Sequence, residues 1–346
     1  MQMTKSADIA SDRVDAASIA DRLRAMESPY LSSWTREAYH ALALTAAAVT
    51  PKLDGWASAC PEINRGRILP LVLSIAAAAP FCSPAAIEST ARMSLWVFAL
   101  DDMFDDQRYM DGELIRRAKH YQSIAIGTAT ADPSDPMAAV LQEVRSDLAS
   151  YPLFSQVEDR WATAACQTIQ GMLVEQRWNA AYREQGAASL PTYDAYVENG
   201  LRSIGGPPHV WSALVTIGDP ATPQSLSLLR RMERTACVCI RLANDLQSED
   251  KEAREGKVNS LTILGHQYEK ASVSQIDALA RARGLVRDDI GDGLLRLGRL
   301  EKRPVTATGL PERAIGGIAR FVCEFYARHD FHTFTQGAAP QGVSPW

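Results

Sequence analysis

The stretch RLANDLQSEDKE, residues 241–252, places Asn244, Ser248 and Glu252 four residues apart. A spacing of four keeps side chains on one face of an α-helix, so a helix here aligns an amide, a hydroxyl and a carboxylate in one stripe. Three oxygen ligands with a single formal charge suit a hard cation such as Mg²⁺ that phosphate also neutralises. The stripe could also be an ordinary polar helix surface, where Asn and Ser are common. However, the apolar run CVCIRLA directly precedes Asn244. We therefore predict that the stripe begins inside the fold.

A second polar cluster, FALDDMFDDQ at residues 98–107, follows the apolar run MSLWVFAL. On a helix Asp101 and Asp105 share one face, and Asp102 and Asp106 share the next. Carboxylates this close raise one another's pKa unless a cation compensates, and acids are unfavourable at a helix C-terminus. The spacing leaves two interpretations open: a solvated helix end, or a metal site.

A similar pattern, RDDIGDG, contains Asp288, Asp289 and Asp292. Glycines flank it and no long apolar run precedes it. We interpret it as a solvated helix start or turn, not as a metal site.

The pattern of apolar residues predicts an all-α fold. Apolar residues recur at i, i+3 and i+4 in residues 138–151, 160–178 and 225–246, and strand signals are nearly absent. We expect a single domain of about ten to twelve helices over residues 26–333. Residues 1–25 and 334–346 are polar or rich in small residues, and we expect both segments to be flexible.

Composition excludes several classes of protein. The 346 residues carry a net charge of −5 without a block of Lys or Arg, so we expect no nucleic-acid partner. The apolar run ILPLVLSIAAAAPF is too short to cross a bilayer and predicts a core helix starting near Pro70. Six cysteines lack metal-finger spacing, which is typical of a reducing compartment. With no secretory signal visible, we expect a cytoplasmic protein without a membrane span.

The ordered pair of motifs, DDxxD at 101–105 and N-D-x-x-S-x-x-x-E at 244–252, resembles that of the class I terpene synthases. The segments YVENGLRSIGGPPHVW (196–211) and EQRWNAAY (175–182) look like the corresponding parts of bacterial-type diterpene synthases similar to kaurene-synthase-like enzymes. The resemblance covers residues 30–330, and the chain has no DxDD motif of class II cyclases. It implies one helical domain around a deep apolar cavity, three Mg²⁺ ions, and a carbon–oxygen lyase (EC 4.2.3 type) that acts on an isoprenoid diphosphate.

The resemblance also assigns roles to individual residues. Catalytic roles fall to Asp101, to Arg202 as a diphosphate sensor, and to Gly206 at a helix break beside Gly205. Asp102 is either a metal ligand or the partner of a basic residue, and His209 is either a terminating base or a core histidine. Arg328 and His329, with Tyr326 nearby, stand where many microbial members carry an Arg-Tyr pair. The implied metal ligands are Asp101, Asp102, Asp105, Asn244, Ser248 and Glu252; the implied diphosphate-binding residues are Arg202, Arg241 and Lys251; the implied cavity wall is Phe98, Trp178 and Trp211.

The substrate stays open at this point. The favoured function is a diterpene synthase acting on a labdane or copalyl-type diphosphate or on geranylgeranyl diphosphate, supplied by a separate class II diterpene cyclase or a prenyl diphosphate synthase. The alternatives are a sesquiterpene synthase acting on farnesyl diphosphate, a chain-elongating prenyltransferase, and a non-enzymatic helical scaffold with solvated acidic faces. Relatives often form dimers, so the resemblance allows a homodimer.

Overall fold

A computed structural model describes residues 16–25, 29–32, 34–105, 111–329 and 331. These residues form fourteen α-helices and three short 3-10 helices, with no strand among them. The all-α prediction is confirmed, but the expected ten to twelve helices are too few. The helices are α1 (Ala16–Ala25), α2 (Pro29–Ser32), α3 (Arg36–Ala57), α4 (Ile68–Ala78), α5 (Pro84–Asp105), α6 (Asp111–Ala125), α7 (Pro136–Ala149), α8 (Phe154–Gln185), α9 (Tyr193–Ser203), α10 (Gly206–Ile217), α11 (Leu226–Glu255), α12 (Ser260–Lys270), α13 (Gln275–Glu301) and α14 (Leu310–Tyr326).

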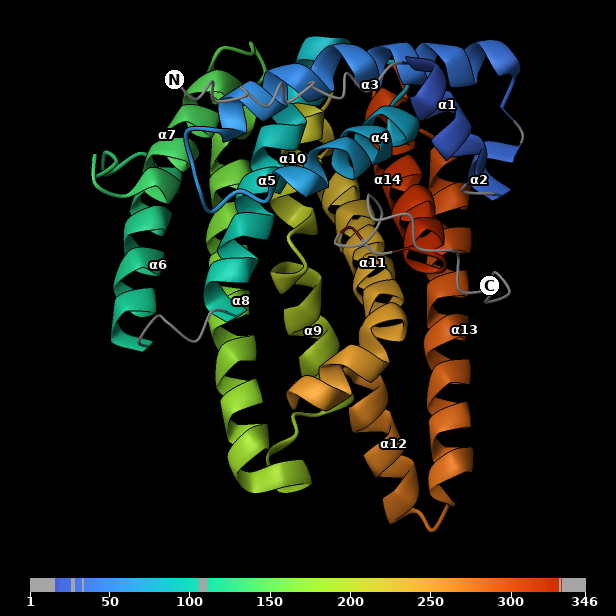
Figure 1. Cartoon of the computed structure of the whole chain (residues 1–346). Coiled ribbons are helices and arrows are strands. Elements are labelled where there is room, and N and C mark those ends of the chain that lie inside the picture. Colours follow the sequence, from blue (N-terminus) through green and yellow to red (C-terminus); the bar gives the residue numbers. More distant parts are fainter. Residues whose placement is uncertain (1–15, 26–28, 33, 106–110, 330, 332–346) are drawn as a thin grey trace, which may run out of the picture.

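The axes of the long helices α8, α11 and α13 are roughly parallel, with α13 running opposite to the other two, and α1 to α4 lie across one end of them (Figure 1). Helices α9 and α10 follow each other end to end between α8 and α11 (Figure 1). Helix α5 packs against α10 and α4, so its C-terminal end reaches the middle of the bundle. This arrangement brings the two motif-bearing helices, α5 and α11, to the same interior space.

Helix α4 is the apolar centre of the covering layer. All eleven of its residues are buried, which explains why its sequence shows no polar face. It begins at Ile68, two residues before the predicted Pro70, because proline is tolerated in the first turn of a helix, where the N–H has no partner. No helix in the described ranges is both long and apolar enough to cross a membrane.

The N-terminal boundary differs from the expectation. Residues 16–25 form α1, whose Ile19 and Leu23 are fully buried and which packs along α3. The prediction of a flexible segment over 1–25 is therefore wrong for its last ten residues. Residues 1–15 and 334–346 lie outside the described residues.

The pattern RDDIGDG also differs, because it lies in the middle of α13 and not at a helix start or turn. Asp289 accepts a hydrogen bond from the Tyr193 hydroxyl at 2.9 Å. A Cβ at Gly293 would overlap the sulfur of Cys239 on α11. Glycine here permits close packing of two helices, so it does not mark a turn.

Candidate active-site cavity

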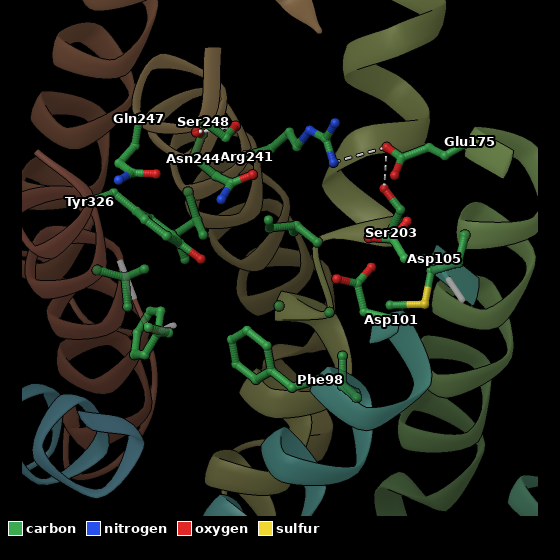
Figure 2. A pocket seen from close by; sticks show the side chains of 18 of the residues that line it. Phe98, Asp101, Asp105, Glu175, Ser203, Arg241, Asn244, Gln247, Ser248 and Tyr326 are labelled. Atoms are coloured by element: carbon green, nitrogen blue, oxygen red, sulfur yellow. Dashed lines mark hydrogen bonds and ion pairs between the residues drawn. The ribbon is translucent and has the colours of Figure 1, made fainter. Parts of the chain in front are cut away.

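A cavity of about 240 Å³ opens between α4, α5, α8, α11, α14 and the junction of α9 with α10. One part of its wall is polar and carries both motifs, and the other part is apolar. Figure 2 shows Asp101 and Phe98 on one side and Asn244, Gln247 and Ser248 on the facing helix. The prediction that the two motifs converge on one hollow is confirmed by this arrangement.

The acidic end of α5 supplies the first group of oxygens. Asp101 and Asp105 line the cavity one helical turn apart, while Asp106 lies outside the described residues. Burial, and then the neighbouring Asp105 carboxylate, raises the pKa of Asp101 to about 7. No hydrogen bond or ion pair to Asp101 occurs within the described residues, and the attraction of the nearby Lys257 does not offset the rise of its pKa.

Asp102 lines the cavity next to Asp101, and Arg67 holds its carboxylate. The two guanidinium nitrogens Nη1 and Nη2 of Arg67 each lie 2.8 Å from a carboxylate oxygen of Asp102. Arg67 also lies over the Phe98 ring, 4.9 Å from its centroid. Asp102 is thus the partner of a basic residue, as one of its two interpretations predicts, and its place among the metal ligands stays a prediction.

Lys257 was not predicted to belong to the site. It lines the cavity just after α11, and its Nζ lies 2.7 Å from Oδ2 of Asp105 and 3.1 Å from Oε2 of Glu255. Burial opposes its charge, but the Asp105 carboxylate raises the pKa of Lys257 above its usual value. In the sequence, the only signal for a role of Lys257 in the site is its place in a run of charged residues after Glu252.

The stripe of α11 supplies the second group of oxygens. Asn244, Ser248 and Glu252 all line the cavity, as the spacing of four residues predicts. Burial, and then the nearby Asp245, raises the pKa of Glu252 to about 7. Nδ2 of Asn259 donates to Oε2 of Glu252 at 2.7 Å and fixes that side chain.

Two predicted diphosphate-binding residues also lie at this end. Lys251 lines the cavity and is exposed. Arg241 is buried in the cavity wall, 3.0 Å from Glu175 and 2.9 Å from Asp245. Its guanidinium therefore forms ion pairs with one carboxylate on α8 and one on α11, and so links the two helices.

Three further predictions of placement are wrong. Arg202 does not line the cavity, and its guanidinium pairs with the carboxylate of Glu198, one turn earlier on α9. Trp211 points to the opposite side of α10, where its Nε1 donates to Glu233 at 2.9 Å. Trp178 stacks on Tyr196, with ring centroids 6.4 Å apart, in a separate small cluster. Of the three predicted wall aromatics, Phe98 alone lines the cavity.

The break between α9 and α10 is where the resemblance implied it. Gly205 has φ +74° and separates the two helices, and both Gly205 and Gly206 line the cavity. His209, in the first turn of α10, also lines it, and burial lowers the pKa of His209 to about 4. Tyr326 closes another side from the end of α14, whereas Arg328 and His329 do not line the cavity.

The donor chemistry fits a hard cation. Asp101, Asp105, Asn244, Ser248 and Glu252 line one cavity, and burial, followed by a neighbouring aspartate, raises the pKa of Asp101 and of Glu252. Across the described ranges, no three His, Cys, Asp or Glu side chains already lie close enough to hold a metal ion. Carboxylate, amide and hydroxyl oxygens are ligands that Mg²⁺ accepts together with phosphate and water, so the donor set itself fits Mg²⁺.

Comparison with known proteins agrees with this geometry. Residues 92–292 match the family described as terpene synthase family 2, C-terminal metal binding. The (-)-delta-cadinene synthase of Streptomyces clavuligerus is 25% identical over 237 residues, which cover 64% of this chain and 67% of that protein. Ent-kaurene synthase-like 1 of Ricinus communis is 25% identical over 65% of this chain, but the match covers 30% of that longer protein.

Solved structures show the same fold. The linalool/nerolidol synthase from Streptomyces clavuligerus, in complex with 2-fluorogeranyl diphosphate, superposes with a TM-score of 0.62 at 20% identity, covering 85% of this chain and 95% of that chain. The matched family region includes both α5 and α11, whose motif residues line the cavity. The chain therefore belongs to terpene synthase family 2 and contains its C-terminal metal-binding region.

Proposed function

We propose that this chain is a Mg²⁺-dependent class I terpene synthase, a lyase that releases pyrophosphate from an allylic C20 diphosphate and cyclises the remaining chain. The observation that supports it most is the convergence of Asp101 and Asp105 with Asn244, Ser248 and Glu252 on one cavity. A scaffold with solvated acidic faces has no reason to gather carboxylates from two helices around one cavity, since like charges brought close together repel one another.

The polar end of the cavity receives the diphosphate in this proposal. Asp101 and Asp105 hold metal from α5, and Asn244, Ser248 and Glu252 hold it from α11, with three Mg²⁺ ions in total. Bound Mg²⁺ supplies Lewis-acid chemistry, drawing negative charge from the leaving group.

Two lysines complete that end. Lys251 and Lys257 donate N–H groups to diphosphate oxygens, and charge-assisted bonds of this kind are stronger than neutral ones. Lys257 would exchange its ion pair with Asp105 for this contact, which would leave the Asp105 carboxylate available to hold metal.

The apolar end holds the hydrocarbon chain. Leu71, Val97, Phe98, Ile318 and Val322 line it and offer no nucleophile. The exclusion of water protects a reactive cation from early capture. The face of Phe98 can also stabilise positive charge by a cation–π interaction.

A second candidate substrate is farnesyl diphosphate. The (+)-T-muurolol synthase of Streptomyces clavuligerus, described as farnesyl diphosphate cyclizing, is 24% identical over a match that covers 80% of this chain and 67% of that protein. For a C20 substrate, a class II diterpene cyclase or a prenyl diphosphate synthase would have to supply it.

Incubation with defined diphosphates tests the proposal. Purified protein and Mg²⁺ are given copalyl-type, geranylgeranyl or farnesyl diphosphate without isopentenyl diphosphate, and products are measured by gas chromatography with mass spectrometry. We expect a cyclic product from one of them, lost with EDTA and in Asp101→Ala but retained in Asp288→Asn, whose aspartate is exposed on α13. Absence of product from all three substrates would end the synthase proposal, and product formation only with isopentenyl diphosphate would favour chain elongation.

A further inference from the structure

One nitrogen base lies in the cavity wall apart from the acidic motifs. His209 is the only histidine among the described residues that line the cavity. Its Nδ1 lies 2.6 Å from Oγ of Ser94 on α5, and Ser94 also lines the cavity. No hydrogen-bond partner of Nε2 occurs among the described residues.

The hydrogen bonds of Ser94 assign the tautomer of His209. Oγ of Ser94 lies 3.2 Å from the carbonyl oxygen of Thr90, one turn earlier on α5. A hydroxyl has one proton, and a carbonyl can only accept, so the arrangement that satisfies both contacts has Ser94 donate to Thr90. Nδ1–H of His209 then donates to Oγ of Ser94, and Nε2 keeps its lone pair. The opposite tautomer would place an unpaired N–H in the cavity.

The environment keeps this lone pair available. Burial lowers the pKa of His209 to about 4, so the imidazole is neutral at pH 7. A carbocation is a far stronger acid than an imidazolium, so even a weakened imidazole accepts a proton from it readily.

The position of His209 suits the hydrocarbon part of a substrate. Ser94 precedes Asp101 by seven residues on α5, which corresponds to about 10 Å along the helix axis. Apolar side chains, among them Val97, Phe98 and Ile204, line the same cavity. The Ser94–His209 pair is therefore remote from the diphosphate end and level with the prenyl chain.

We propose that His209 is the base that ends the reaction, accepting through Nε2 the proton that the last carbocation loses. This inference rests on the proposed function. In the step, a C–H bond next to the cationic carbon breaks, and its electron pair forms a C=C double bond. The proton bonds to Nε2, giving an imidazolium that later passes the proton to water or pyrophosphate. Ser94 acts as a positioning residue, because it fixes the tautomer.

The tautomer is tested without turnover. Nitrogen-15 NMR of histidine-labelled protein, with His209→Gln to assign the signal, reports where the proton lies. We expect a neutral ring protonated at Nδ1 at pH 7, and a loss of this preference in Ser94→Ala. An Nε2–H ring or an imidazolium in the unaltered protein would overturn the inference whatever the enzyme does.

Product analysis tests the base itself. Each product of His209→Gln is measured as a fraction of all substrate consumed, so a change in the overall rate does not affect the comparison. We expect the main olefin to fall several-fold in favour of other double-bond isomers or an alcohol of the same skeleton, because only the final step loses its base. His266→Gln is the matched control, since His266 lies on α12 outside the cavity, and we expect its products to be unchanged.

The outcomes separate the two proposals. An unchanged product pattern in His209→Gln, a change of skeleton alone, or an alcohol as the sole product of the unaltered protein would overturn the role of His209 and leave the synthase intact. No product from the unaltered protein with any diphosphate would instead remove the proposed function, and the role of His209 with it.

Discussion

Asp101 and Glu252 are carboxyl groups whose charge the protein alone does not balance. Both pKa values are raised to about 7, in each case first by burial and then by a nearby aspartate. The ligand-free fold therefore carries unfavourable electrostatics at neutral pH. Active sites often hold such destabilised groups, because binding the correct cation relieves them.

The destabilising effect of the charged Asp101 carboxyl can be tested by measuring how the stability of the metal-free protein depends on pH. Its pKa rises from an ordinary 3.8 to about 7 on folding, so between those values the folded state binds a proton that the unfolded state has released, and stability falls as pH rises. Asp101 is partly solvated, which reduces the effect. In EDTA we expect Asp101→Asn to be more stable than the unaltered protein at pH 8, by on the order of 1 kcal/mol, and equally stable near pH 4. Urea unfolding measures the difference, and a difference that is the same at both pH values would contradict it.

The positions of some site residues follow from the periodicity of a single helix, whereas those of others depend on contacts between distant parts of the chain. Asn244, Ser248 and Glu252 follow from periodicity, because all three lie on one helix. Arg67 meets Asp102, and Lys257 meets Asp105, across long separations in the chain. No local pattern contains such contacts.

The prediction for Arg202 failed for a local reason. The motif resemblance placed its guanidinium at the diphosphate, but Glu198 lies one turn earlier on the same helix and pairs with it. Pairs at i and i+4 face each other on a helix surface, so this competitor was visible in the sequence.

Arg67 offers a second test at the level of single residues. Its side chain is 2% exposed and that of Asp102 is 41% exposed, so Arg67→Met leaves a partly solvated carboxylate without its bidentate partner. We expect a loss of about 1–3 kcal/mol in the free energy of unfolding, below the range for fully buried pairs. The matched control is Arg65→Met, which breaks the exposed pair with Asp54 and should lose about 0–1 kcal/mol. Equal losses in urea unfolding would show that the Arg67 pair contributes no more than a surface contact.

At the level of elements, the junction of α9 and α10 shapes the cavity wall. Gly205 adopts φ +74°, and a Cβ there would overlap Cγ1 of Val97 on α5. A Cβ at Gly206 would lie 2.6 Å from Sγ of Cys237 on α11. The two glycines therefore let the broken helix approach both motif-bearing helices closely.

Substitution of Gly205 separates backbone strain from close approach. Gly218, at the end of α10, has φ +69° and nothing near its missing Cβ, so Gly218→Ala reports the cost of the left-handed backbone alone, about 1–2 kcal/mol. We expect Gly205→Ala to lose about 2–4 kcal/mol, because overlap with Val97 adds to that cost. Val97→Ala in the same chain should recover part of the loss. Equal losses for the two glycine variants in urea unfolding would contradict the close approach.

Elements were predictable where their periodicity was strong. Helix α11 was expected from its apolar stripe, and its Asn244, Ser248 and Glu252 line the cavity together, as their spacing predicts. Helix α13 was misread around Asp288 because its glycines were taken as turn signals, although Gly293 serves packing against Cys239. Sequence alone does not distinguish these two uses of glycine.

At the scale of the whole molecule, the cavity exists only because α5 and α11 face each other across the bundle. All-α class and motif identity were predictable, since both follow from residue patterns within single helices. The positions of Trp178 and Trp211 were not, because they depend on which side of α8 and α10 faces the cavity. That choice is set by packing among many helices.

Binding of pyrophosphate with Mg²⁺ tests this convergence directly. A ligand that binds only the folded state raises its stability, by about 2.7 kcal/mol at a hundredfold excess over Kd, so we expect the two together to raise Tm by a few degrees. Asn244→Ala and Glu252→Ala should lose the shift, because each removes an oxygen from the α11 stripe, and Asp101→Ala should lose it from the facing helix. Asp288→Asn, on the exposed side of α13, should keep it. Full shifts in the α11 variants, measured by differential scanning fluorimetry, would mean that the acidic faces are merely solvated and that the two helices do not bind a common ligand.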